Sequence, residues 1–499
     1  FISIVCGLAL VVIFMIAYYS KGGFVANLTL LFNIFFIMGI LAQPSLGTAL
    51  TLPGIAGIVL TMGMAVDANV LIFERIKEEL ALGRTIKEAV RLGYKHAFSA
   101  IFDSNLTTLI TGFFLFILGQ GPIKGFATTL MIGIITSFFS AIFISRIIVE
   151  WMTRKEGSNL SLTTPLTRLI KKRKYIQFVE KRRPAYYISS AVIVIGLVLL
   201  FIQGMNLGVD FKGGRSYLVS FNQPVSATDL KIDLAKSFEN QGLEVKNYGS
   251  NNVMKVTTSY LVNEESEEAD QKVRQALIAG IEQIFPGIKY SPNDASVDDE
   301  HFTISGSSKV GASIADDIKN SAWQASLFSL LGIFVYIMIR FRKWQYSAGA
   351  IIALVHDTLF VFAAYAIAGL FGLTFEVDQV FVAAILTIIG YSINDTVIIF
   401  DRVREFVNLG TSHDRKKIFN DALNSTLSRT FITSGTTLLV VFVLFIFGGE
   451  VLRGFSFALL IGITVGTYSS LFIAAPVVID LEEEQKTKQT AGKKPVPAH

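Results

Sequence analysis

The hydrophobic residues of this chain are gathered into eleven long runs, separated by polar segments. A run of about 20 apolar residues is long enough to cross the hydrocarbon core of a bilayer as an α-helix. The runs predict spans at residues 1–19, 24–42, 53–73, 97–118, 126–150, 186–204, 321–339, 346–370, 378–400, 430–447 and 455–479. Of the 499 residues, 52% are hydrophobic and 17% are charged. These values are typical of a polytopic α-helical membrane protein and exclude a chain of soluble domains.

Lysine and arginine are distributed unevenly among the segments that connect the spans. The segments rich in them are 74–96, 151–185 and 340–343, and the segments without any are 43–52 and 371–377. Cytoplasmic loops carry an excess of Lys and Arg, so the basic segments are predicted to be cytoplasmic. The alternation of spans then places residues 205–320 on the outer face. That segment has 11 Lys and Arg against 17 Asp and Glu, which gives a net charge of −6, whereas the whole chain carries +5.

The outer segment predicts a small α+β domain. Its strand patterns lie at 215–221, 243–248, 253–258 and 301–305, and its helix patterns lie at 226–240 and 264–285. The order βαββαβ is that of a ferredoxin-like split unit. The segment has no cluster of His, Cys or Asp with metal-ligand spacing and no nucleophile motif. We therefore expect a binding or lever role and not an enzyme.

The predicted organisation has six parts. They are a five-span module at 1–150, a basic cytoplasmic linker at 151–185, a single span at 186–204, the outer domain at 205–320, a second five-span module at 321–480 and a disordered cytoplasmic tail at 481–499. Two cytoplasmic segments, 74–96 and 401–427, are predicted to be pairs of short amphipathic helices hinged at Gly83 and Gly410. We expect these segments to brace the bundle at the membrane interface, and docking of a cytoplasmic partner is the alternative.

The two membrane modules repeat each other. At an offset of 327 residues, VDANVLIFERIKE at 66–78 lies over INDTVIIFDRVRE at 393–405. At an offset of 329 residues, Gly125-Phe126 lies over Gly454-Phe455. Corresponding spans run in the same direction, so the repeats are parallel and related by an axis along the membrane normal. The second module has a span and an outer domain before its five spans. We therefore expect the N-terminus to be truncated, with one helix and a further outer domain preceding residue 1.

Three charged residues are candidates for an ion-coupling site. Asp67 lies seven residues before Glu74 and Asp395 lies six residues before Asp401, the acidic residues that close their spans, so both lie roughly 10 Å inside the cytoplasmic edge. Arg429 begins the tenth span, and its side chain is long enough to reach a carboxylate at that depth. Charged groups are costly in a membrane and mark ion pathways. The alternative remains open that the aspartates are structural and that Arg429 is an interfacial anchor.

Four further polar residues are candidates for a proton relay, namely His356, Asp357, Asn394 and Asn69. Histidine titrates near neutrality without help, although a structural histidine would give the same pattern. The single cysteine, Cys6, has no partner for a disulfide, and no metal or organic cofactor is predicted. The basic residues follow the topology and lack interleaved aromatic residues, which argues against nucleic acid as a partner.

Three stretches carry a family resemblance. TMGMAVDANVLIFERIKEE at 61–79 resembles the fourth-helix motif of SecD, and GYSINDTVIIFDRVREF at 390–406 resembles its SecF counterpart. NLGVDFKGG at 206–214 resembles the segment that opens the SecF periplasmic domain. With both halves on one chain, residues 1–480 resemble the fused SecDF family of the resistance-nodulation-division superfamily. That family has twelve spans, so the resemblance implies that the N-terminal helix and the first periplasmic domain are absent here.

The resemblance implies an accessory subunit of the Sec preprotein translocase in the bacterial cytoplasmic (inner) membrane. After the SecA ATPase starts a preprotein through the SecYEG channel, such subunits promote late-stage export with the proton or sodium motive force. The resemblance also implies a YajC-like small membrane protein as a partner, and it maps the family's intramembrane charged residues onto Asp67, Asp395 and Arg429. Two other functions stay open: an exporter of lipid or a small amphiphile from the same superfamily, and a structural scaffold for the translocon.

Overall fold

The computed structural model describes residues 2–492 apart from 44–50, 156–159, 166, 168–174, 240, 249, 265, 293–297 and 411. The helices of the first module are α1 (Ile2–Tyr19), α2 (Lys21–Leu41), α3 (Leu52–Ala81), α4 (Ile86–Leu118), α5 (Gly121–Phe139) and α6 (Ser145–Met152). Those of the second are α8 (Arg182–Gln203), α12 (Ala312–Phe341), α13 (Trp344–Leu370), α14 (Gln379–Asn408), α15 (Arg415–Phe447), α16 (Glu450–Ser469) and α17 (Ala475–Gly492). Parts of the predicted loop 43–52, linker 151–185 and tail 481–499 lie outside the described residues.

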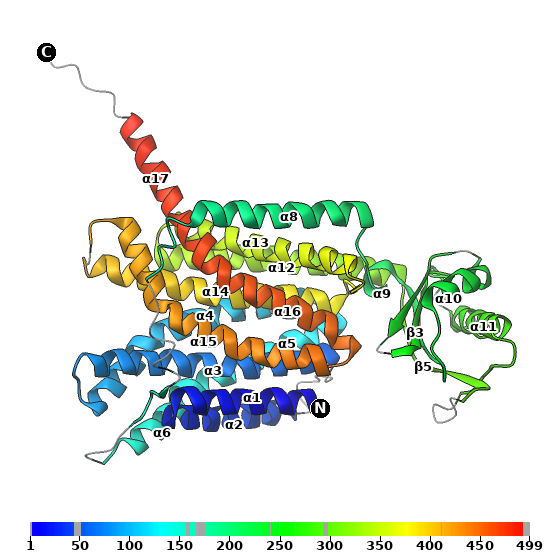
Figure 1. The fold of residues 1–499 in the computed structure, drawn as a ribbon, viewed down its shortest axis with the longest axis horizontal. Coiled ribbons are helices and arrows are strands. Elements are labelled where there is room, and N and C mark those ends of the chain that lie inside the picture. The colour runs from blue at the N-terminus through cyan, green and yellow to red at the C-terminus, as the bar shows by residue number, and fades with distance from the viewer. Residues whose placement is uncertain are drawn as a thin grey trace.

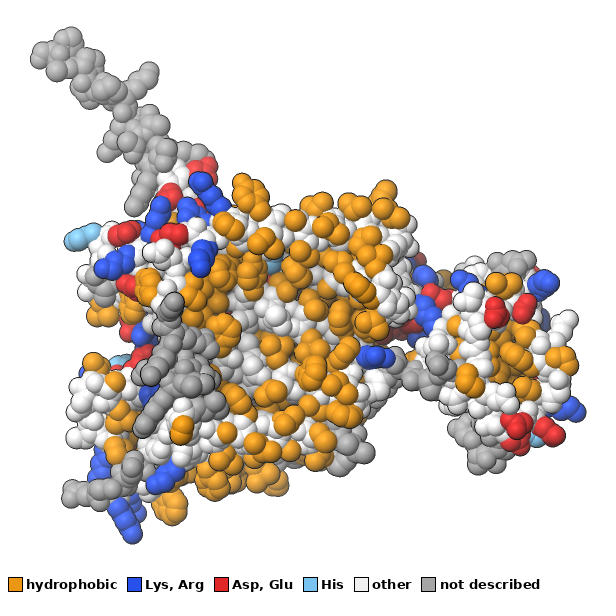
Figure 2. All heavy atoms as spheres, viewed as in Figure 1, with side chains coloured by type: hydrophobic (Ala, Val, Ile, Leu, Met, Phe, Trp, Pro, Cys, Tyr) orange, Lys and Arg blue, Asp and Glu red, His pale blue; other side chains and the backbone are white. Residues whose placement is uncertain are grey.

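Every predicted span falls on an apolar helix. Within the described residues, ten helices are long and apolar enough to cross a membrane. Helix α1 is also apolar, but its apolar stretch, Val5–Tyr19, is shorter. Figure 1 shows these helices side by side, with the outer domain at one end of the bundle. In Figure 2, apolar side chains cover the flank of the bundle, and Lys and Arg side chains gather at the end opposite the outer domain. This arrangement agrees with the predicted topology.

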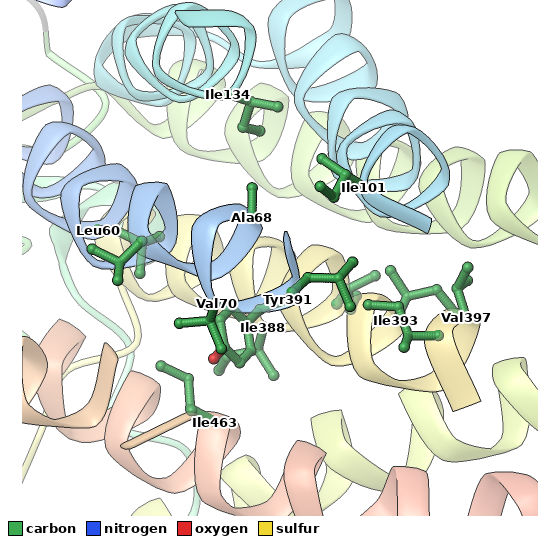
Figure 3. Packing of buried hydrophobic residues seen from close by; sticks show 14 of the residues in the cluster. Leu60, Ala68, Val70, Ile101, Ile134, Ile388, Tyr391, Ile393, Val397 and Ile463 are labelled. Carbon is green, nitrogen blue, oxygen red and sulfur yellow. The ribbon is translucent and has the colours of Figure 1, made fainter. Parts of the chain in front are cut away.

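Helices α3 and α14 form the centre of the bundle. In their most apolar stretches, 83% of α3 and 94% of α14 is buried, whereas the value for α8 is 17%. Both helices are apolar on nearly all sides, which is the pattern of a helix enclosed by other helices. In Figure 3, Val70 of α3 and Val397 of α14, which are equivalent in the repeat, lie in one packed core. Ile134 and Ile463, also equivalent, belong to the same core.

The two modules repeat each other in local structure as well. Helices α5 and α16 are each followed by a short π-helical turn, Ser140–Ile144 and Ser470–Ala474, at positions that correspond to within one residue. Gly133 of α5 packs against Thr61 of α3, and its equivalent Gly462 of α16 packs against Ile388 of α14. At both glycines a Cβ atom would lie less than 3 Å from the facing side chain. Close approach of backbones at small residues is a common way to pack membrane helices.

The outer domain has the predicted ferredoxin-like topology. Its elements are β1 (Gly214–Ser220), α10 (Ala227–Leu234), β2 (Leu243–Tyr248), β3 (Ser250–Thr258), α11 (Glu267–Ile284), β4 (Lys289–Tyr290) and β5 (His301–Val310). The sheet order is β2-β3-β1-β5-β4, and the four long strands are antiparallel to their neighbours. The two-residue β4 is an addition at the edge of the sheet, parallel to β5. Apolar residues of the sheet and of both helices form a separate core.

A contact region that we call the outer joint attaches this domain to the membrane helices. It consists of residues 206–210, just before β1, and residues 375–379, which lead into α14. Leu207 and Val377 form a β-bridge, and the amide of Gly208 donates to the carbonyl of Val377 at 2.9 Å. Asp210 accepts a hydrogen bond from the amide of Gln379, the first residue of α14, at 3.1 Å. The outer domain is therefore attached directly to the start of α14.

Three predicted boundaries were wrong. The tail was expected to be disordered from residue 481, but α17 continues to Gly492. Its polar start is stabilised by ion pairs from Glu482 to Arg415 and Lys343, which local composition does not reveal. Helix α12 begins at Ala312, so the last residues of the predicted outer domain belong to a spanning helix. The segments 74–96 and 401–427 are extensions of α3, α4, α14 and α15 and not separate interfacial helices, although both bend at the predicted glycines, Gly83 and Gly410.

The glycine contacts of the repeat predict a stability difference. Replacing Gly133 with Ala places a Cβ 2.6 Å from Thr61, a short and rigid side chain, and overpacking of this kind costs about 1–3 kcal/mol. Thermal unfolding in detergent should show a lower Tm for G133A. Gly435 of α15 is the matched control, because a Cβ there meets nothing within 4 Å. An equal loss in G435A would contradict the packing account.

Candidate functional site

The three charged residues predicted from the sequence meet at the interface between the two repeats. Asp67 lies on α3, Asp395 on α14 and Arg429 on α15, and their side chains are buried with exposed fractions of 7%, 3% and 5%. The guanidinium of Arg429 lies 3.8 Å from the carboxylate of Asp395. Asn394, the repeat equivalent of Asp67, donates its amide to the Asp67 carboxylate at 3.1 Å. The two repeats therefore contribute to one buried polar site.

Hydroxyl groups surround this site on the α15 side. Thr433 lies beside Asp67, and Ser434 lies beside Asp395. Further along α15, Thr437 contacts the hydroxyl of Tyr391 at 3.4 Å. Small hydroxyl residues let helices approach closely, and they also provide hydrogen bonds inside a membrane. The site is thus a polar core in an otherwise apolar bundle.

Several polar atoms of the site have hydrogen-bonding capacity to spare. Among the described residues, Asp67 Oδ1, Asn394 Oδ1 and Arg429 Nε and Nη1 have no hydrogen-bond partner. Two carboxylates share one guanidinium, so uptake of one proton or one monovalent cation would bring the site to neutrality. Because neutral groups are far less costly than charged ones in a membrane, the site suits a change of charge state.

His356 and Asp357 belong to a second buried cluster, between α13, α14 and α16. The Asp357 carboxylate, 1% exposed, accepts hydrogen bonds from Ser392 at 2.5 Å and Ser469 at 2.9 Å. His356 Nδ1 lies 3.0 Å from the other carboxylate oxygen. Ser392 is three residues before Asp395 on α14, so one helix carries both clusters. A relay between them remains a prediction, because within the described residues no hydrogen bond joins them directly.

Within the part of the chain that the structure describes, Asn69 forms no hydrogen bond to Asp67 or Asp395. Its side-chain amide donates to the carbonyl of Ala65 in its own helix at 3.4 Å. The predicted relay role of Asn69 therefore has no contact that supports it, whereas Asn394 joins the site directly.

Sequence reasoning missed a further buried acid, Asp103 of α4. Its carboxylate binds the Arg340 guanidinium at 2.5 Å and the Tyr336 hydroxyl at 2.8 Å, both from α12. The sequence did contain an indication of this residue, because Asp103 is a charged residue inside the predicted span 97–118. With both oxygens paired, Asp103 ties α4 to α12 and is a structural ion pair by its geometry. Ser392 and Ser469 were also missed, since a serine in an apolar helix has the same pattern as a packing residue.

Comparisons with known families decide the affiliation of the chain. The family model described as "Protein export membrane protein SecD/SecF, C-terminal" matches residues 1–155 and 291–484. A second model, "SecD/SecF GG Motif", matches residues 198–225, which include the first half of the outer joint. The chain belongs to the SecD/SecF family. It is therefore a multi-pass protein of the bacterial inner membrane, with the SecD-like and SecF-like modules fused.

Curated relatives agree with this affiliation. The SecDF protein translocase subunit of Bacillus subtilis is 34% identical over 98% of this chain and 64% of its own length. The separate SecF subunit of Rhodothermus marinus is 42% identical over 61% of this chain and 92% of its own length. The SecD subunit of the same organism is 61% identical over 30% of this chain and 24% of its own length. The two separate subunits thus match shares of the chain that correspond to its two modules.

A solved structure has the same fold. The crystal structure of SecDF from Thermus thermophilus, described as a translocon-associated membrane protein, superposes with a TM-score of 0.82 at 32% identity. It covers 96% of this chain and 62% of that protein. A SecDF structure in a super-membrane-facing form superposes with a TM-score of 0.73. The chain therefore spans somewhat less than two thirds of the length of these fused relatives.

The contact between Asn394 and Asp67 predicts a specific loss of stability. In N394A the Asp67 carboxylate loses its amide donor inside the membrane, and a buried group left without a partner costs about 1–3 kcal/mol. Thermal unfolding in detergent should show a larger decrease in Tm for N394A than for N69A. Asn69 is the matched control because it is also buried, with an exposed fraction of 1% against 9% for Asn394, but bonds only within its helix. Equal decreases would argue against a paired site.

Proposed function

We propose that this chain is the membrane part of an accessory subunit of the Sec preprotein translocase. It uses the proton or sodium motive force to promote late-stage export of preproteins across the inner membrane, and it does not catalyse a covalent reaction. The observation that carries the proposal is the buried site of Asp67, Asp395 and Arg429 at the interface of the two repeats. The names of its relatives support the Sec translocase as the setting. We propose SecYEG, SecA, a YajC-like small membrane protein and the preprotein itself as partners.

The physical basis of the proposal is a change of charge at this interface. With both carboxylates ionised, Arg429 balances only one of the two negative charges, so the site carries one excess negative charge. Entry of a proton or Na⁺ from the outer side removes that charge, and release to the cytoplasm restores it. One elementary charge that crosses 100 mV supplies about 2.3 kcal/mol, so several ions can bias a two-state movement of the modules.

The outer joint offers a route from the site to the outer domain. Asp395 lies 16 residues after Gln379 on the same helix, a distance of about 24 Å along α14. Lys255 of β3 forms an ion pair with Glu376 at 2.6 Å, and Lys246 of β2 donates to the side chain of Asn206 at 2.6 Å. A shift of α14 therefore moves the residues that hold the outer domain. We propose that the outer domain acts as the lever on the emerging preprotein.

The replacement of Asp395 tests the motor directly. D395N keeps the size of the side chain and removes its ability to ionise. In inverted membrane vesicles that contain the translocase, D395N should abolish the increase in preprotein translocation that an imposed membrane potential produces. The early step that depends on ATP alone should remain. If the membrane potential still stimulates translocation in D395N as it does in the unchanged protein, the motor hypothesis is wrong and a structural scaffold is favoured. Loss of solute efflux, with normal translocation, would favour the exporter.

The joint can be tested separately from the ion site. D210A removes the carboxylate that holds the first amide of α14, so the ion site stays intact while its link to the outer domain weakens. We expect a several-fold decrease in potential-driven translocation, measured in the same vesicles. D233A, on the exposed face of α10, is the matched control in the same domain. If both variants translocate at the same rate, the joint does not transmit the movement.

A further inference from the structure

The cytoplasmic ends of the two central helices are tied together by four charged side chains. We call them the cytoplasmic clasp: Arg75 and Glu78 of α3, and Arg402 and Glu405 of α14. Arg75 binds Glu405 across the interface at 3.2 Å, and Arg402 binds Glu78 across it at 3.2 Å. Each arginine also binds the glutamate three residues later in its own helix, at 2.9 Å and 2.8 Å.

The clasp has the symmetry of the repeat. Arg75 and Arg402 are separated by 327 positions, as are Glu78 and Glu405, which is the offset that aligns the two modules. The two pairs within helices are ordinary surface pairs of spacing i, i+3. The two pairs between helices differ, because they join the helices that carry Asp67 and Asp395. Both arginines are largely covered, with exposed fractions of 15% and 13%, whereas the glutamates are 44% and 39% exposed on the cytoplasmic side.

Two small cavities lie near the clasp and the ion site, one beside the ion site and one next to the clasp. The inner cavity is lined by residues that include Asp67, Asn394 and Arg429. The volume in it that water can occupy is about 20 Å³. The lower cavity is lined by the clasp residues Arg75, Glu78 and Arg402 and also by Ala100 and Arg429. The volume in it that water can occupy is about 50 Å³. A single water molecule needs about 10–15 Å³ by this measure. The cavities therefore suit water and small ions, and they are far too small for a peptide.

The two cavities share Leu71 and Arg429 as a common wall. The lower cavity is also lined by Glu74 and Asp401, which are equivalent in the repeat. The two cavities are thus neighbours between the ion site and the clasp, separated by the side chains of Leu71 and Arg429. Beside the lower cavity, the paired arginines and glutamates of the clasp cover the space between α3 and α14.

We infer that the cytoplasmic clasp is the inner gate of the ion path. When its two interhelical ion pairs are formed, the lower cavity is shielded from the cytoplasm and the site exchanges no ion with it. When α3 and α14 separate at this end, both pairs break together and the lower cavity opens. Partly exposed ion pairs are individually weak, so the gate can open without large cost while its symmetry keeps it closed at rest. The inference rests on the proposed function, since it assigns the cytoplasmic exit of that same ion.

The first test measures access to the lower cavity and needs no ion transport. Ala100, which is 3% exposed and lines the lower cavity, is replaced by cysteine in a C6S background of the full chain. A membrane-impermeant maleimide is added from the cytoplasmic side of inverted vesicles. Neutralising both glutamates, E78Q/E405Q, weakens both interhelical pairs and should increase the labelling rate of A100C by about tenfold.

Two control variants separate the gate from general loosening. The fourfold exchange R75E/E78R/R402E/E405R reverses every charge but preserves all four pairs, so labelling should return to the slow rate. E150Q breaks an exposed pair, Arg146–Glu150, elsewhere on the cytoplasmic side and should leave the rate unchanged. Fast labelling in the exchanged variant, or a slow rate in E78Q/E405Q, overturns the gate.

The second measurement distinguishes failure of the gate from failure of the proposed function. In proteoliposomes with an internal pH-sensitive or sodium-sensitive dye, E78Q/E405Q should show a proton or sodium leak that D395N removes. If A100C becomes accessible but no leak that depends on Asp395 appears under a proton gradient or a sodium gradient, the gate stands and the ion site is wrong. If labelling is unchanged while D395N still abolishes potential-driven translocation, the ion site stands and the gate is wrong.

Discussion

The structure depends on the burial of two carboxylates and one guanidinium where the two repeats meet. Charges inside a membrane are tolerated where partners are present, and here the partners come from both modules. Asp67 receives its hydrogen bond from Asn394, and Asp395 receives its countercharge from Arg429. Neither module alone provides this set. The polar site therefore holds the modules together, and we propose that a change in its charge alters how strongly they are held.

Helix α14 connects the features that the proposed motor requires. Its start is fixed to the outer domain through Gln379, its middle carries Asn394 and Asp395, and its cytoplasmic end carries the clasp residues Arg402 and Glu405. It is also the most buried of the candidate spans, so it cannot move without its neighbours. Packed interfaces of this kind have a few discrete arrangements and do not deform continuously. We therefore propose that a change of charge at Asp395 is transmitted along α14 to both membrane surfaces.

The sequence predicted the elements well and the contacts only in part. Hydrophobic runs located every span, and the repeat and the strand order of the outer domain followed from local patterns. Asp67, Asp395 and Arg429 could be found because charge in an apolar run is rare. The Asn394–Asp67 contact joins residues 327 positions apart, and only the folded packing brings them together. The helical start of the tail escaped prediction for the same reason, because Glu482 is held by distant basic residues.

The central claim is that the charge state of Asp395 sets the position of the outer domain. The most direct test places spin labels on exposed positions of the outer domain and of the membrane part, K231C and F371C in a C6S background, in proteoliposomes. The distance distribution between the labels is measured with and without an imposed proton or sodium gradient. The account predicts that the gradient shifts the distribution and that D395N abolishes the shift. A distribution that ignores both gradients, or a shift that persists in D395N, would contradict it.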